Sequence, residues 1–209
     1  MQLYHNPLSP NGRKVNAAIV HLGLGDQVES KIVQPFQGET RTPEFLGINP
    51  NAKIPALVDG DFKLWESNVI MAYLGEKAGN TEFWPSGQAR YDAMRWMNWE
   101  AAHFNPVVGV FLFENLLKNM MGAGDPDAAK LEQASKDFER YGKVLDEALA
   151  GRSFLLGDKP TIADFSVCAP LGYAGAAKVP VAQFPNVVAW MRRMEEVPAW
   201  AATAHRMGG

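Results

Sequence analysis

The sequence contains a single cysteine, Cys168, among its 209 residues. One thiol cannot form an intramolecular disulfide, a cysteine-pair zinc site or a dithiol redox centre, so we expect a reducing, cytoplasmic environment. Positive charge is not in excess either, because 20 Lys and Arg residues stand against 23 Asp and Glu residues. This balance argues against nucleic acid and anionic membranes as partners.

Long apolar runs and a signal-like N-terminus are also missing. The most apolar stretch, residues 107–117, includes Gly109, Glu114 and Asn115. It is shorter than the roughly 18 apolar residues that a membrane-spanning helix needs. Residues 1–6 lack the basic and apolar regions of a signal peptide. The histidines show no ligand spacing, so we predict no metal site.

Residues 1–78 alternate short β-branched segments with helical ones, which is typical of a mixed α/β domain. The helix between the first two strands makes them parallel, whereas Asp59-Gly60-Asp61 predicts a hairpin and an antiparallel pairing of the last two. We therefore expect a mixed four-stranded sheet covered by helices. The predicted strands are 3–6, 28–33, 54–58 and 62–64, and the predicted helices are 11–24 and 66–77.

Helical periodicity replaces this alternation from residue 88 onward. One apolar stripe recurs at steps of four and three residues: Ala134, Phe138, Tyr141, Leu145 and Ala148. Residues 79–87 carry glycine, proline and polar residues without periodicity, so we predict a linker there. The remaining chain, 88–209, should form an all-α domain whose first helix is kinked or broken near Pro106.

Pro55 needs an explanation because it stands at the entrance to a strand, in Lys53-Ile54-Pro55, where a proline cannot donate to the sheet. If the Ile54–Pro55 bond is cis, the N–H and C=O of Ile54 point outward and can pair with an extended peptide. An ordinary trans turn is the more frequent alternative.

Two further motifs place polar side chains at helix starts. Glu66-Ser67 opens a helix whose N–H groups and dipole favour a carboxylate, while Glu66 could hold an ammonium group. The loop after the first strand offers Ser9 and Asn11 at the start of the next helix. Ordinary capping explains each position taken alone. Ser9 lacks the surroundings of a nucleophilic serine, so donating a hydrogen bond suits it better.

The order and spacing of these motifs resemble the glutathione S-transferase superfamily, and the resemblance covers nearly the whole chain. It implies a thioredoxin-like N-terminal domain over 1–78 followed by a helical domain. Thr161-Ile162-Ala163-Asp164 matches the capping box that opens the family's buried helix. The Ser9-Pro10-Asn11-Gly12 stretch looks closest to bacterial serine/asparagine-type members, Nu-like or theta/phi-like.

The resemblance also implies that glutathione is the co-substrate and that Ser9 and Asn11 are the catalytic residues, stabilising its thiolate. Lys53 would meet the glycyl carboxylate. Thr40 stands where relatives often carry a longer polar residue for that carboxylate, and Arg41 could substitute for it. The implied glutathione-binding residues come from all three motifs and the segment of Thr40: Ser9, Asn11, Thr40, Lys53, Ile54, Pro55, Glu66 and Ser67.

The electrophile would bind beyond the sulfur, in a cleft between the two domains. The long helix that starts near residue 88 has a second apolar stripe that could form one wall of this cleft. The residues of that stripe are Trp99, His103, Val107 and Phe111. Core or dimer packing explains any one of them equally well.

We therefore predict a detoxifying glutathione transferase that activates the thiolate for attack on an apolar electrophile. The same site could instead serve a glutathione-dependent disulfide or peroxide reductase, or a non-catalytic member that binds glutathione or a protein. The resemblance further implies a homodimer, with Phe62, Arg90 and Tyr91 as candidate interface residues. The second substrate cannot be identified from the sequence, because apolar pockets discriminate weakly.

Overall fold

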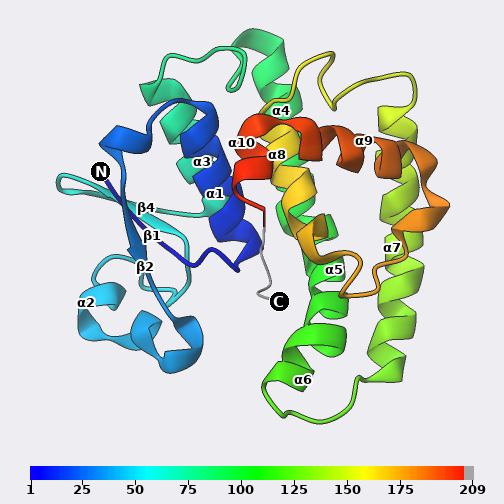
Figure 1. Ribbon diagram of the computed structural model, residues 1–209. Helices are drawn as coiled ribbons and strands as arrows, with labels where there is room; N and C mark the ends of the chain where they lie inside the picture. Colours follow the sequence, from blue (N-terminus) through cyan, green and yellow to red (C-terminus); the bar gives the residue numbers. More distant parts are fainter. Residues whose placement is uncertain (205–209) are drawn as a thin grey trace. The chain divides into compact units, whose positions relative to one another are not determined.

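The computed structural model describes residues 1–204 and contains two compact units (Figure 1). The first unit comprises Met1–Ser86 and the described residues from Val197 onward, and the second comprises Gly87–Glu196. The first is a mixed α/β unit and the second is helical, which confirms the predicted fold class. The boundaries differ from the prediction at the linker and at the last helix.

A four-stranded sheet in the order β2-β1-β3-β4 organises the first unit (Figure 1). β1 and β2 pair in parallel, and β3 pairs antiparallel with both β1 and β4, as a mixed sheet requires. Gly60 has φ +60°, which suits the tight turn between β3 and β4. The strands are β1 (Gln2–His5), β2 (Glu29–Ile32), β3 (Ala56–Asp59) and β4 (Phe62–Trp65).

Helices cover both faces of this sheet. α1 (Pro10–His21) and α3 (Ser67–Lys77) pack against each other (Figure 1). On the opposite face, α2 (Pro43–Leu46) carries Phe45 into a small core with Val33 and Ala56. α2 was not predicted, because a four-residue helix is too short to show a period.

Residues 79–87, the predicted linker, mostly belong to the first unit. Phe83 and Trp84 are buried, and a Cβ added at Gly75 on α3 would lie 2.7 Å from Trp84 Cβ. The glycine therefore allows this segment to pack closely on α3. Turn composition predicted the absence of regular structure correctly, but it could not reveal that two aromatic side chains anchor the segment.

The last helix, α10 (Pro198–Ala202), returns to the first unit and packs on α1. Arg13 of α1 donates through its guanidinium to the Trp200 carbonyl oxygen at 3.1 Å, and its Cζ lies 4.2 Å from the centroid of the Trp200 ring. The prediction placed this segment in the helical domain. Helical periodicity indicates a buried face, but it does not say which unit buries that face.

The second unit keeps the chain helical through Pro106. A π-helical segment, Glu100–Phe104, directly precedes α5, and Pro106 lies in the first turn of α5, where a missing N–H is tolerated. The helix therefore continues past Pro106 and changes to π-helical hydrogen bonding just before it, instead of breaking. The α-helices of this unit are α4 (Gly87–Trp99), α5 (Asn105–Leu112), α6 (Lys118–Met120), α7 (Ala128–Leu149), α8 (Ile162–Cys168) and α9 (Pro185–Glu196). A second π-helical segment, Phe113–Leu117, links α5 to α6.

The buried face of α7 is rotated slightly from the predicted stripe. Gly142 and Leu149 are buried, whereas Tyr141 and Ala148 are only half-buried. A Cβ added at Gly142 would lie 2.3 Å from the ring of Phe184, so the glycine makes room for that ring. The predicted apolar stripe did not include Gly142, because glycine has no apolar side chain.

The predicted capping box at the start of α8 is confirmed. Thr161 Oγ1 accepts from the Ala163 N–H at 3.3 Å, and the Thr161 N–H donates to Asp164 Oδ2 at 2.9 Å. Asp164 is 0% exposed and also accepts from the Leu155 N–H at 2.9 Å and the Trp190 indole N–H at 3.0 Å. Burial raises the pKa of Asp164, and these hydrogen bonds act in the opposite direction.

Candidate active site

The sheet register brings the three predicted motifs to one edge of the first unit. Ala56, the first residue of β3, pairs with Tyr4 on one side and with Trp65, the last residue of β4, on the other. The loop after β1, the turn before β3 and the start of α3 therefore leave the sheet at the same edge.

Asn6 shapes the loop between β1 and α1. Its Oδ1 accepts from the Leu8 N–H at 3.0 Å, and its Nδ2 donates to the Val33 carbonyl oxygen at 3.0 Å. Ser9 is the N-cap of α1, and its Oγ accepts from the Gly12 N–H at 3.2 Å. Because the Ser9 oxygen acts as the acceptor in this bond, its hydroxyl hydrogen can be donated elsewhere.

The Ile54–Pro55 peptide bond is cis, which is the less frequent of the two alternatives that the sequence left open. Asn49 holds the turn before it, because its Nδ2 donates to the Lys53 carbonyl oxygen at 2.6 Å and its Oδ1 accepts from the Asn51 N–H at 3.0 Å. Ile54 lies outside β3, and within residues 1–204 its N–H and C=O have no hydrogen-bond partner. An extended peptide could pair with both groups.

The start of α3 is open to a ligand. No side chain caps this helix, and Glu66, the exposed residue before it, has φ +71° and ψ 109°. Residues other than glycine rarely adopt this backbone conformation, and proteins retain such strain mainly at functional sites. The positive end of the helix dipole favours an anion at this position.

One hydrogen bond joins the two helix starts. Ser67 Oγ donates to Asn11 Oδ1 at 3.3 Å, and Ser67 is only 8% exposed. The bond occupies the carbonyl oxygen of the Asn11 amide and leaves its Nδ2 hydrogens for another acceptor. Asn11 and Ser67 are 56 positions apart in the sequence, and this contact places the predicted thiol-binding and carboxylate-binding groups side by side.

Charged side chains of both signs are accessible near these motifs. Lys53, Arg41 and Glu66 are exposed, and the described part of the chain offers their side chains no ion pair or hydrogen bond. Thr40 is only 3% exposed, so Arg41 is the more accessible of these two neighbours. The exposed cations and the exposed carboxylate suit a ligand that carries both kinds of charge.

His5, the last residue of β1, is buried. Its Nε2 lies 2.8 Å from Ser30 Oγ, and burial lowers the pKa of its imidazole. Burial therefore disfavours a positive charge on this ring.

The residues predicted to form the electrophile pocket all lie in the second unit. Trp99 and His103 contact the ring of Tyr141, with centroid distances of 6.0 and 5.7 Å. Trp99 and Val107 are half-buried and His103 is exposed, whereas Phe111 is buried in the core of the unit. Trp99, His103 and Tyr141 thus form an aromatic cluster, whereas the ring of Phe111 packs against that of Phe138, with centroids 6.1 Å apart.

Sequence reasoning missed the residues that position the site. Asn6 and Asn49 organise its two loops, and the Asn-Pro pairs that they begin are a recognisable turn signal. Gly12 is also required, since a Cβ there would lie 2.5 Å from the Asn6 carbonyl oxygen. The need for this glycine depends on a close approach that no local pattern reveals.

The fold is that of a two-domain protein with a thioredoxin-like first domain and a helical second domain. Residues 1–76 match the model of the glutathione S-transferase N-terminal domain, and residues 102–198 match that of the glutathione S-transferase C-terminal domain. Glutathione S-transferase 3 of Zea mays is 33% identical to this chain, over 97% of this chain and 92% of the relative.

Solved structures agree with this match. Glutathione transferase F7 from Populus trichocarpa is 25% identical and superposes with a TM-score of 0.89, over 100% of this chain and 99% of that one. A glutathione transferase family member from Pseudomonas fluorescens, solved with two glutathione bound, is 30% identical with a TM-score of 0.86, over 97% and 91%. The chain belongs to the glutathione S-transferase family. Its activity is that of a glutathione transferase, and it binds glutathione.

No helix within residues 1–204 is both long and apolar enough to cross a membrane. The same residues contain no group of three His, Cys, Asp or Glu side chains that could hold a metal ion.

Proposed function

We propose that the edge formed by the three motifs clasps glutathione and presents its thiolate to an apolar electrophile. The observation that carries this proposal is the hydrogen bond from Ser67 to Asn11, which joins the start of α3 to the start of α1. It sets a carboxylate-binding helix start beside a pair of groups that can donate to a sulfur.

Each part of glutathione has a group of matching chemistry. Glu66 binds the γ-glutamyl ammonium, and the backbone N–H groups at the open start of α3, beginning with that of Ser67, bind the adjacent carboxylate. The N–H and C=O of Ile54, the residue before Pro55, pair with the cysteinyl backbone. Lys53 binds the glycyl carboxylate, and Arg41 or the buried Thr40 is the second proposed contact of that carboxylate.

Ser9 and Asn11 stabilise the thiolate. A thiol with a pKa of about 8.5 is only a few per cent ionised at neutral pH, and lowering that pKa by about two units requires roughly 2.7 kcal/mol. One hydrogen bond to a charged group supplies about 1.5–3 kcal/mol, and a helix N-terminus adds about 0.3–1 kcal/mol. The Ser9 hydroxyl hydrogen and the Asn11 amide hydrogens are both free to donate in this arrangement.

A bound-thiol titration tests this assignment. Thiolate absorbance in the ultraviolet should show a pKa well below that of free glutathione, and Ser9→Ala should lower kcat at least about tenfold with little effect on KM. Asn16→Ala, about two turns after Ser9 on α1, is the control and should change neither kcat nor KM. An unshifted thiol pKa in the unsubstituted protein contradicts activation. Unchanged turnover in Ser9→Ala transfers the role to Asn11, which Asn11→Ala then tests.

A second candidate reaction is glutathione-dependent reduction of a disulfide or peroxide. The Pseudomonas fluorescens relative was solved with two glutathione bound, and a relative from Phanerochaete chrysosporium was solved with oxidised glutathione. Parallel assays with an aryl halide and a small disulfide separate the two reactions. Faster turnover of the aryl halide supports transfer to an apolar electrophile. Trp99, His103, Val107 and Phe111 are the proposed lining of the electrophile pocket.

The proposed assembly is a cytoplasmic homodimer. Phe62 and Tyr91 are 50% and 72% exposed, which is unusual for aromatic side chains, and Arg90 adjoins Tyr91. Sedimentation velocity should detect a species of twice the chain mass, and Phe62→Ser combined with Tyr91→Ser should shift it toward the monomer. A monomer before substitution contradicts the homodimer.

A further inference from the structure

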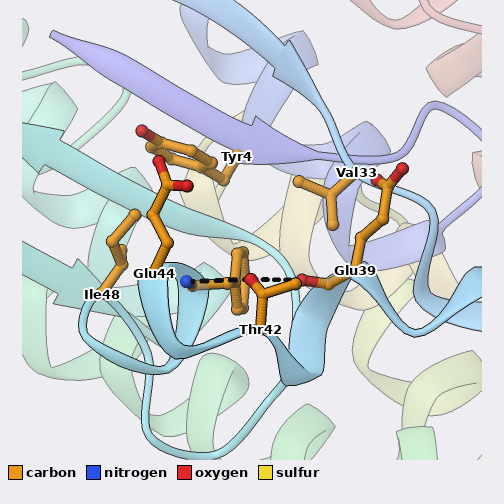
Figure 2. Close-up of a pocket in the computed structure, with 7 residues that line it drawn as sticks. Tyr4, Val33, Glu39, Thr42, Glu44 and Ile48 are labelled. Carbon is orange, nitrogen blue, oxygen red and sulfur yellow. Dashed lines mark hydrogen bonds between the residues drawn. The ribbon is translucent and has the colours of Figure 1, made fainter.

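The first unit contains a pocket that the glutathione site does not use. It lies beside β1 and α2 and has a volume of about 230 Å³ (Figure 2). It is lined by Tyr4, Val33, Glu39, Thr42, Glu44, Phe45 and Ile48. None of them is among the residues to which glutathione binding is assigned above.

The floor of the pocket is apolar and aromatic. The rings of Tyr4 and Phe45 meet edge to face, with centroids 6.1 Å apart. Val33 and Phe45 are buried, and Ile48 packs against them. The Tyr4 hydroxyl donates to Gln2 Oε1 at 3.1 Å, so this tyrosine is engaged away from the thiol-binding loop. Such a floor favours an alkyl chain and the face-on approach of a cation.

Two carboxylates border this floor. In Figure 2 the carboxyl group of Glu44 lies beside the Tyr4 ring, while that of Glu39 lies apart from it, near Val33. Glu39 Oε2 accepts from the Gln34 N–H at 2.7 Å, and Glu39 Oε1 is left for a ligand. Within residues 1–204 no Lys, Arg or His forms an ion pair with either carboxylate, and the Glu44 side chain has no hydrogen bond.

We propose that this pocket binds a linear alkane diamine. Its two ammonium groups pair with the separated carboxylates of Glu39 and Glu44, and its methylene chain lies on the floor between them. A dication neutralises both carboxylates, which a single ammonium cannot do when the carboxylates are apart. A neutral chain of the same length gains only the apolar contact.

Nuclear magnetic resonance titration tests the proposal with the five-carbon diamine cadaverine as the probe. Amide shifts should change at Tyr4, Val33 and Ile48. The dissociation constant should be about fivefold lower than for pentylamine, because one more exposed ion pair forms, and added salt should weaken binding. Equal affinities for cadaverine and pentane diol would overturn the proposal. Saturating glutathione should leave the titration unchanged, and competition would instead place the diamine at Glu66.

Charge-neutral variants provide the second arm of the test. Glu39→Gln and Glu44→Gln should each weaken cadaverine binding about fivefold, and the double variant about 25-fold if the two effects add. A glutamine at position 39 retains an oxygen that can accept from Gln34. Glu76→Gln is the matched control, since Glu76 is an exposed carboxylate of the same unit outside the pocket. Unchanged affinity in the double variant, or equal loss in the control, overturns the assignment. Glutathione transfer should persist in all these variants, so failure of the pocket and failure of the proposed function are distinguishable.

Discussion

The starts of α3 and α8 solve one physical problem in opposite ways. Every helix begins with N–H groups that lack partners within the helix. At α8 the chain satisfies such groups itself, through Thr161 and the buried Asp164. At α3 no side chain caps the helix, and Glu66 before it holds a strained backbone conformation.

The difference separates a structural anchor from the proposed carboxylate-binding site. Asp164 draws the loop at Leu155 and the α9 residue Trp190 to the start of α8, so its acceptors are fully used inside the fold. The start of α3 keeps its electrostatic attraction for a ligand carboxylate, and Ser67 links it to Asn11. The completed cap thus marks a structural anchor at α8, whereas the missing cap at α3 leaves N–H groups for a ligand.

The largest expected effect follows from removing the buried acceptor. Asp164→Ala leaves the N–H groups of Leu155 and Thr161 and the indole of Trp190 without this partner, at about 1–3 kcal/mol for each unsatisfied donor. We expect the free energy of unfolding to fall by about 3 kcal/mol or more, measured by urea denaturation.

Two variants keep that test interpretable. Asp158→Ala removes an exposed carboxylate from the same loop and should change stability by less than about 0.5 kcal/mol. Asp164→Asn retains one acceptor oxygen and should lie between the two if the alanine variant does not fold. A loss below about 1 kcal/mol in Asp164→Asn and Asp164→Ala alike would contradict the anchoring role.

The corresponding change at α3 should act on binding. Ser67→Ala removes the hydrogen bond that holds Asn11 beside the start of α3, worth about 0.5–1.5 kcal/mol, so glutathione should bind about two- to tenfold more weakly in calorimetry. Stability should change by no more than about 1.5 kcal/mol. Ser86→Ala, at an exposed serine of the same unit, should leave glutathione affinity unchanged. A stability loss matching that of Asp164→Ala would remove the distinction between the two helix starts.

Thr161→Ala weakens only the cap of α8 and should cost about 1 kcal/mol of unfolding free energy. Thr161→Ser retains the accepting hydroxyl and should recover most of that loss. Glutathione affinity should stay constant in both variants, because α8 belongs to the second unit and carries none of the proposed glutathione contacts. Unchanged stability in Thr161→Ala would show that Asp164 alone closes the helix.

A third helix start sharpens the comparison through pH. Glu114 accepts from the N–H of Asp127, the N-cap of α7, and from Lys118 at 2.9 Å each. These bonds hold the pKa of Glu114 below its ordinary value of 4.5. A lowered pKa in the folded state stabilises the protein above that ordinary value, and the contribution disappears as pH falls through the folded value.

The measurement is urea denaturation from neutral pH down to about pH 3. Glu114→Gln should be less stable than the unsubstituted protein at neutral pH, and the difference should narrow below the ordinary pKa. Glu132→Gln, which breaks an exposed ion pair with Lys136, is the control and should show a smaller change with pH. A difference that stays constant with pH would contradict the role of Glu114.

Local chemistry made much of the fold and site predictable. The hairpin at Gly60, the unusual position of Pro55 and the Thr161–Asp164 spacing each concern neighbours within a few residues. Turn preferences, proline geometry and capping act at that range. The family resemblance then supplied the assembly of these pieces into one site.

The unpredicted features depend on contacts between distant segments. The bond from Ser67 to Asn11 requires the register of β1, β3 and β4, and the room that Gly142 makes for Phe184 requires the packing of α7 against the segment before α9. The predicted apolar stripe also included Tyr141, which is only half-buried, because a period of 3.6 residues tolerates a small rotation of the buried face.

The return of α10 to the first unit sets an order of events during translation. All residues of the helical unit, Gly87–Glu196, leave the ribosome before α10 does. The first unit contains the strand that is synthesised earliest. Its packing nevertheless cannot be completed until Trp200 emerges, because the Trp200 carbonyl oxygen accepts from Arg13. A nascent chain halted just before Val197 has every element of the proposed glutathione clasp but lacks the helix that packs on α1 at Arg13, two residues after Asn11.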